Sequence, residues 1–257
     1  MKEYFKYSFK HDRNCFGYSL GCFFNMKETE FDKFAEEYSS LHQQSIRFSG
    51  EAPSYFSEYK IRDTANILTE EERNGSIDII DFGSGVGSSV PFIHKYFPQG
   101  NLTCLDVSSK SLDLAKKRFP NQANFCSFDG DVIPFNDNSF DLVFSACVFH
   151  HIDHDEHDSL IKEIHRVLRS GGLLVIFEHN PFNPFTRHAV NICPFDENAV
   201  LLKASQLVKV FRKAGFSEIS RKYRVFIPGF LRGLRWLENF IGWLPLGAQY
   251  YVAARKK

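Results

Sequence analysis

The chain has 257 residues and 43% apolar residues, enough for one large α/β domain with its own core. Basic and acidic residues balance at 31 each, so no overall charge favours nucleic acid or an anionic surface as a partner. No apolar run approaches the roughly 20 residues of a membrane span. The six cysteines form no C-x-x-C pair, which favours a reducing, cytoplasmic setting.

The first part of the chain divides into two stretches. Residues 1–25 are rich in Phe, Tyr and Cys but lack the apolar core and cleavage site of a signal peptide. We expect an N-terminal extension there, either poorly ordered or forming an extra lid element. A single domain is expected over 26–257, and the helical spacing of its first apolar residues predicts a helical cap over 26–75.

A glycine-rich loop follows the first predicted strand, 77–81. Glycines at every second position allow positive φ angles and let a ligand approach the backbone closely. The helix that follows directs its free N–H groups towards the loop, which favours a nucleotide-type cofactor. The residues expected to contact this cofactor are Asp81, Gly83, Ser84, Gly85 and Gly87.

The second predicted strand, 101–106, ends in an acidic residue. Asp106 lies nineteen positions after Gly87, close to the roughly 20-residue offset at which a carboxylate binds a pair of ribose hydroxyls. We therefore place Asp106 and its neighbour Val107 in the cofactor site. An NAD(P)-binding oxidoreductase remains the alternative, although its G-x-G-x-x-G spacing differs from the G-x-G-x-G found here.

Two stretches resemble the motifs of the class I S-adenosylmethionine-dependent methyltransferases, of the type 11 small-molecule kind. They are the D-x-G-x-G-x-G run that starts at Asp81 and the run DGDVIPFNDNSFDLVF over 129–144. The resemblance implies an α/β fold with a doubly wound, seven-stranded, mostly parallel sheet whose last strand is antiparallel, and an N-terminal helical cap. It also implies S-adenosylmethionine as cofactor and S-adenosylhomocysteine as product. Asp129 would accept from the adenine amino group, and Gly130 would offer its backbone to the ring.

The fourth predicted strand, 140–145, ends at the edge where open α/β sheets bind ligands, so Ser145 and Ala146 are expected beneath the cofactor. Four histidines follow within residues 150–157. Their spacing matches no zinc pattern and no cysteine joins them, so we expect no metal site. His154 and His157 are expected at the solvated start of a helix over 156–168.

Two histidines are the candidate catalytic bases, because an imidazole can accept a proton near pH 7. His151 follows the fourth strand, and His179 follows the fifth strand, 173–178. The reaction predicted from the resemblance is methyl transfer to O or N of a small-molecule, saccharide or lipid-linked acceptor. A protein that binds the cofactor without transferring a methyl group is the second alternative.

An apolar insertion over 227–246 precedes the last predicted strand. Burying each of its large side chains is worth roughly 1.5–3 kcal/mol, so we expect this stretch to be covered. Three covers are possible: the N-terminal layer, a second subunit or a lipid interface. A lipid interface would make this cytoplasmic protein peripheral at the membrane. The runs EHNPFNPFTR over 178–187 and CPFD over 193–196 resemble a bacterial subgroup associated with saccharide and lipid biosynthesis loci. No nucleic-acid partner is expected.

Overall fold

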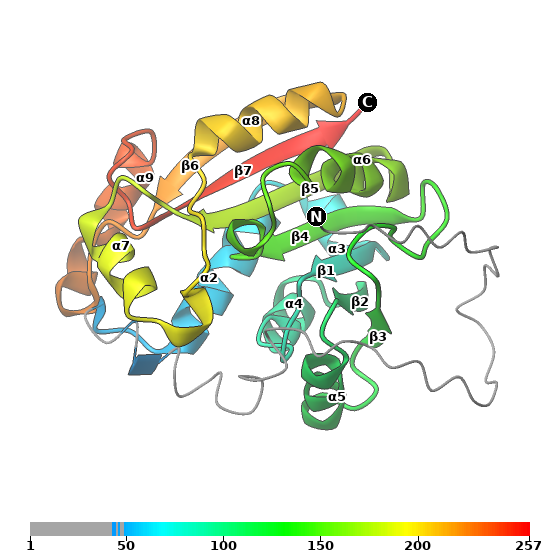
Figure 1. Ribbon diagram of the computed structural model, residues 1–257, viewed down its shortest axis with the longest axis horizontal. Helices are drawn as coiled ribbons and strands as arrows, with labels where there is room; N and C mark the ends of the chain where they lie inside the picture. The colour runs from blue at the N-terminus through cyan, green and yellow to red at the C-terminus, as the bar shows by residue number, and fades with distance from the viewer. Residues whose placement is uncertain (1–42, 45, 47–48) are drawn as a thin grey trace, which may run out of the picture.

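The computed structural model describes residues 43–44, 46 and 49–257, which form a mixed sheet between two layers of helices (Figure 1). The predicted extension over 1–25 lies outside the described residues, as does most of the cap before residue 49. The division into an extension and one domain therefore stays a prediction. In the described part of the chain, no helix combines the length and the apolar character needed to cross a membrane.

One sheet of seven strands has the order β3-β2-β1-β4-β5-β7-β6. Neighbouring strands from β3 to β5 are parallel, and β7 runs antiparallel to both β5 and β6. This confirms the predicted fold class, including the reversed last strand. The bounds are β1 Asp78–Phe82, β2 Asn101–Asp106, β3 Asn124–Ser127, β4 Phe140–Ala146, β5 Leu168–His179, β6 Phe216–Arg224 and β7 Gln249–Lys256.

Helices cover both faces of the sheet because its central strands are apolar on both sides. In β1, Ile79 packs in a cluster with helices α2, α4 and α5, whereas Ile80 packs in a second cluster with α6 and α8. Figure 1 shows α6 and α8 along one side of the sheet and α4 and α5 on the other. The bounds are α2 Pro53–Ala65, α3 Glu70–Asn74, α4 Val90–Tyr96, α5 Ser109–Arg118, α6 His157–Val167, α7 Pro184–Asn191 and α8 Ala204–Lys213.

The strand order reverses at β1, which has β2 on one side and β4 on the other. In an open α/β sheet the ligand crevice lies outside the carboxyl ends of the strands at such a reversal. Two 3₁₀ turns border this edge, η3 Phe149–His151 after β4 and η4 Pro194–Asp196 after α7.

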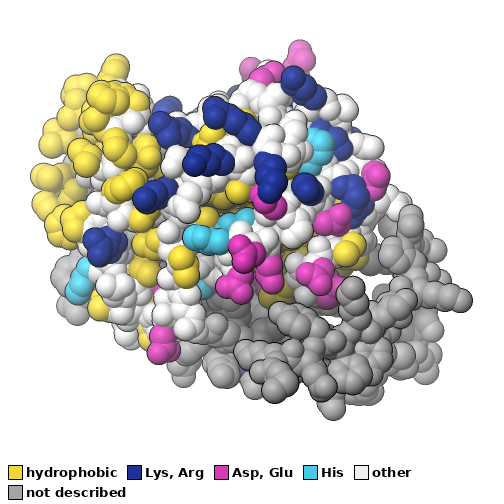
Figure 2. Space-filling view, turned by 45° about the horizontal axis from the view of Figure 1, so that its top comes forward, with side chains coloured by type: hydrophobic (Ala, Val, Ile, Leu, Met, Phe, Trp, Pro, Cys, Tyr) yellow, Lys and Arg dark blue, Asp and Glu magenta, His cyan; other side chains and the backbone are white. Residues whose placement is uncertain are grey.

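The predicted insertion forms a 3₁₀ helix, η5 Gly229–Leu237, and a short helix, α9 Glu238–Ile241. Many of its large side chains are exposed in the described structure, together with two phenylalanines next to or on α7. Figure 2 shows hydrophobic side chains gathered at one end of the molecule. We call this surface the apolar end; it consists of Phe182, Phe185, Phe230, Leu231, Leu234, Trp236, Phe240, Trp243 and Leu246.

Candidate active site

One cavity of about 670 Å³ lies at the carboxyl edge of the sheet. Its volume falls in the range of roughly 300–1,000 Å³ that is typical of small-molecule sites. One half, the cofactor half, is lined by the glycine loop after β1 and the turns after β2 and β3. The other half, the acceptor half, is lined by residues of α2, the turns after β4 and β5, η4 and the start of β7.

The three glycines of the loop all have positive φ, but they differ in what surrounds them. A Cβ on Gly83 would lie 2.3 Å from a methyl group of Val148, and one on Gly87 would lie 3.1 Å from the Cβ of Ala115. A Cβ on Gly85 would meet nothing within 4 Å in the described structure. Gly83 and Gly87 thus permit tight packing, whereas Gly85 presents bare backbone to the cavity.

Asp106 organises this half through its carboxylate. One oxygen accepts a hydrogen bond from the backbone N–H of Gly85 at 2.7 Å, and the other accepts from the N–H of Ser108 at 2.8 Å. The side chain is nearly buried and lines the cavity. Each carboxylate oxygen can accept a further hydrogen bond, so two vicinal hydroxyls could be bound without disturbing the loop.

Asp81 is buried, and its Oδ2 makes no hydrogen bond to any described residue. Burial and the nearby carboxylate of Asp106 raise its pKa to about 7, against smaller opposing effects of Ser89 and Lys60. An unpartnered buried carboxylate oxygen is costly unless a cation or donor reaches it. Asp81 is one of the residues that line the cavity, and an ammonium group of a bound ligand could satisfy this carboxylate.

The predicted cofactor residues do not all line the cavity. Ser84, Val107, Gly130 and Ala146 do, as do Asp81, Gly83, Gly85 and Asp106. Asp129 is exposed, and its Oδ1 accepts from the N–H groups of Asp131 and Val132, so it caps the turn after β3. Ser145 is fully buried in β4, and Gly87 packs on α5. For all the residues named here, contact with the cofactor stays a prediction.

The acceptor half is built around Glu178 at the end of β5. Its Oε1 accepts from the backbone N–H groups of Val148 and Phe149, which fixes the turn after β4. Its Oε2 lies 2.6 Å from Nδ1 of His150. Burial alone would lower the pKa of His150, but the carboxylates of Glu178 and Asp196 raise it to about 10.

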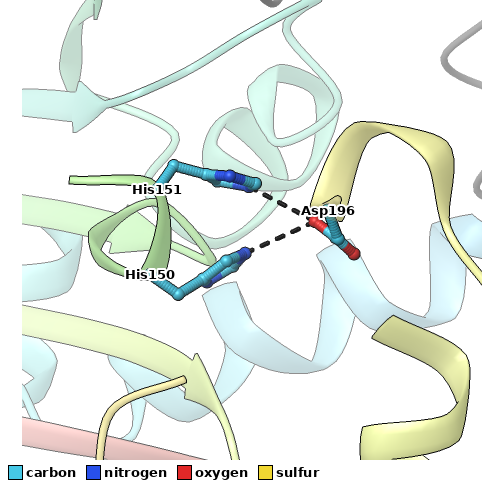
Figure 3. A group of neighbouring side chains, drawn as sticks. All are labelled: His150, His151 and Asp196. Atoms are coloured by element: carbon cyan, nitrogen blue, oxygen red, sulfur yellow. Dashed lines mark ion pairs between the residues drawn. The ribbon is translucent and has the colours of Figure 1, made fainter. Parts of the chain in front are cut away.

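Asp196, 45 residues after His151, completes this cluster (Figure 3). Its Oδ1 lies 3.5 Å from Nε2 of His150 and 3.3 Å from Nε2 of His151. Burial alone would raise the pKa of Asp196, but the two imidazoles hold it well below its usual range. Burial lowers the pKa of His151, which lines the cavity.

The second predicted base, His179, lines the same half beside Cys147. Cys147 has a φ of 59°, uncommon outside glycine, and this turn directs the chain from β4 into η3. Burial disfavours its thiolate, but His179 and Lys60 lower its pKa to about 7. The ammonium of Lys60 lies 3.3 Å from this sulfur, and Gln249 of β7 also lines the half.

Sequence reasoning misplaced one histidine and missed three residues of the acceptor half. His157 is buried, with Nε2 3.0 Å from the carbonyl oxygens of Phe149 and Ile152, so its prediction as a solvated residue is wrong. Lys60, Asp196 and Gln249 come from segments far from the motifs. Only the CPFD run at 193–196 gave a signal for Asp196, because it belongs to the resembling subgroup's pattern.

Comparisons with known proteins support the same class of protein. The family model of the methyltransferase domain matches residues 80–176. The chain is 28% identical to a ubiquinone/menaquinone biosynthesis C-methyltransferase of Desulfotalea psychrophila, over 63% of this chain and 73% of that protein. It is 33% identical to a demethylmenaquinone methyltransferase of Thermotoga maritima, over 41% of this chain and 44% of that protein.

Solved structures share the fold. A Thermotoga maritima protein described as a S-adenosylmethionine-dependent methyltransferase, possible histamine N-methyltransferase, superposes with a TM-score of 0.63 at 19% identity. The match covers 89% of this chain and 98% of that one. The fold and the matched domain define a class I methyltransferase. Residues 80–176 match the methyltransferase domain family, and the protein is identified as a methyltransferase that uses S-adenosylmethionine as cofactor.

Proposed function

We propose that the protein methylates a hydroxylated, quinol-like small molecule bound in the acceptor half of the cavity. The observation that carries this proposal is the continuity of one cavity with a glycine loop and two carboxylates at one end and a histidine cluster at the other. The names of two relatives support a quinol, because one is a quinone-biosynthesis C-methyltransferase and the other a demethylmenaquinone methyltransferase.

The residues of the cofactor half fit S-adenosylmethionine. When bound, this cofactor supplies an electrophilic methyl group on a sulfonium. Asp106 would accept from the two ribose hydroxyls while keeping its bonds to Gly85 and Ser108. The unpartnered Oδ2 of Asp81 would accept from the cofactor's ammonium group, and the bare backbone at Gly85 would allow the close approach.

The acceptor half would align a nucleophile with the methyl group and exclude water. Methyl transfer breaks the sulfur–carbon bond, forms a bond from that carbon to the acceptor, and releases a proton from the acceptor. A quinol can react at oxygen or at a ring carbon next to the hydroxyl. The prediction of transfer to O or N therefore extends to carbon. His151 and His179 remain the candidate bases that take this proton.

The apolar end supports an acceptor with an apolar tail, presented at a lipid surface. Trp236 and Trp243 are 60% and 74% exposed. Lys203 lies 5.9 Å above the ring of Phe182, and further exposed basic residues are Arg187, Lys222 and Arg232. Figure 2 shows lysine and arginine side chains beside the hydrophobic ones. Exposed aromatic residues beside basic residues are typical of surfaces that bind anionic lipid.

The test is a transfer assay with a methyl-deuterated cofactor. The purified protein is incubated with short-chain quinols, simple phenols and amines without hydroxyl groups, and products are identified by mass spectrometry. We expect a labelled methyl group on a quinol, with its position at carbon or oxygen read from the fragments. Transfer to the amines alone would contradict the proposal. Cofactor binding without transfer to any component of a cell extract would favour the catalytically silent alternative.

A further inference from the structure

The cluster of His150, His151 and Asp196 has the geometry of a metal-binding site. One atom from each side chain, a ring nitrogen or a carboxylate oxygen, lies within 4.8 Å of the other two. Both histidines, on η3, direct Nε2 towards the same oxygen of Asp196, which lies on the separate turn η4 (Figure 3). The set combines two imidazoles with one carboxylate, which suits a divalent transition metal.

The distances are long for direct hydrogen bonds and fit a shared metal. The two N···O separations are 3.5 Å and 3.3 Å, whereas N–H···O bonds cluster at roughly 2.7–3.2 Å. Zinc binds nitrogen and oxygen ligands at roughly 2.0–2.2 Å in a tetrahedral arrangement, which places neighbouring ligand atoms about 3.4 Å apart. The two nitrogen–oxygen separations match the edge length of such a tetrahedron.

The surroundings of His150 supply a second, independent observation. Metal-binding histidines typically donate their other ring N–H to a carboxylate, which fixes the ring. Nδ1 of His150 lies 2.6 Å from Glu178, itself held by two backbone N–H groups. His150 is 1% exposed, and its Nε2 makes no hydrogen bond to a described residue. This buried nitrogen is directed at the oxygen of Asp196.

We propose that His150, His151 and Asp196 bind a divalent metal ion. Two imidazoles and one carboxylate favour Zn²⁺. The fourth position of this ion is open and would take an oxygen of the acceptor. The binding of the acceptor's oxygen rests on the proposed function, whereas the binding of the metal does not. Three protein ligands with one open position are typical of catalytic zinc. Such an ion polarises a bound hydroxyl and orients it. It would also remove His151 from the candidate bases and leave His179.

The proposal departs from the sequence-based expectation of no metal site. That expectation considered the histidines of 150–157 together, whereas the structure separates them. His154 and His157 are outside the cluster, and the third ligand comes from 45 residues beyond His151. Short-range spacing patterns contain no information about such a ligand.

The test measures metal binding directly, on the full chain after chelator treatment. Calorimetric titration with zinc sulfate should give one site per chain, and cobalt(II) should give a visible absorption band typical of four-coordinate metal. His151→Gln and Asp196→Asn should each weaken zinc binding by more than about tenfold. His154→Gln removes an exposed histidine three residues away and should leave the affinity unchanged. Thermal unfolding confirms that each variant is folded.

The cofactor affinity of the same samples separates this proposal from the proposed function. If S-adenosylmethionine binds but zinc does not bind at one site, the metal proposal is wrong and the methyltransferase stands. Zinc affinity that is equal in His151→Gln and in the parent also overturns it, because the metal then sits elsewhere. A cobalt band that shifts when a short-chain quinol is added would support the open position, and a band that ignores the quinol would contradict it.

Discussion

The two halves of the cavity are built in different ways. The cofactor half comes from consecutive strand–helix connections between residues 81 and 130, and its lining includes the glycines Gly83, Gly85 and Gly130. The acceptor half combines side chains that lie far apart in the sequence, from Lys60 to Gln249. In the cofactor half, the buried carboxylate of Asp81 has an unpartnered oxygen. In the acceptor half, the carboxylates of Glu178 and Asp196 already face imidazoles. This difference is expected if the cofactor is shared with other methyltransferases and the acceptor is particular to this chain.

The largest expected effect tests whether the halves are separable. His179→Ala should lower turnover by about 100- to 10,000-fold if its imidazole takes the acceptor's proton. Affinity for S-adenosylmethionine should stay within a few-fold of the parent, because His179 lies in the acceptor half. Single-turnover rates and calorimetry measure the two quantities. Normal turnover would exclude His179 as the base, and a parallel loss of cofactor affinity would show that the halves are coupled.

The separation also explains how much the sequence could predict. The cofactor half was predictable because glycine spacing and the acidic ends of β1 and β2 are local patterns with a direct backbone cause. Asp129 was carried over from the family's motif, and its exposure here depends on how the turn after β3 folds. Asp196 and Gln249 reach the acceptor half only through tertiary packing of η4 and β7, which no local pattern encodes. The buried state of His157 has the same origin.

A second prediction concerns the charge of Asp81. In the unfolded chain it ionises near 3.8, but in the folded chain only near 7. Between these pH values the unfolded state releases the proton first, so rising pH favours unfolding until about pH 7. Asp81→Asn removes this effect. Its free energy of unfolding relative to the parent should rise with pH, from near zero at pH 4 to at most about 4 kcal/mol at pH 8.

Urea unfolding of the ligand-free parent and variant across this pH range measures the difference. Other titrating groups are common to both proteins and largely cancel. A difference that does not change with pH would mean that Asp81 is ionised in the folded state throughout. The same variant should bind S-adenosylmethionine more weakly than the parent at pH 8, since the carboxylate can no longer attract the ammonium group.

A third prediction compares the two other acidic residues assigned to the cofactor. Asp106→Ala should weaken cofactor binding by about 30- to 150-fold, equivalent to roughly 2–3 kcal/mol for a lost charged hydrogen-bond pair. Asp129→Ala should weaken it by less than about tenfold, because the exposed Asp129 is bonded to its own turn and does not line the cavity. Calorimetry on both variants measures this. Equal losses of cofactor affinity in the two variants would show that Asp129 does contact the cofactor.

The smallest effect on chemistry is expected at the apolar end, because none of its residues lines the cavity. Trp236→Ser combined with Trp243→Ser should lower binding to anionic phospholipid vesicles at least about tenfold, because two large exposed side chains no longer insert. Val132→Ser is the matched control, since Val132 is 52% exposed on the turn after β3. Flotation measures binding, and light scattering measures mass. Turnover of a water-soluble quinol should not change.

A different outcome would assign this surface to a second copy of the chain. In that case the parent protein would not bind vesicles and would be a dimer, and the double variant would be a monomer.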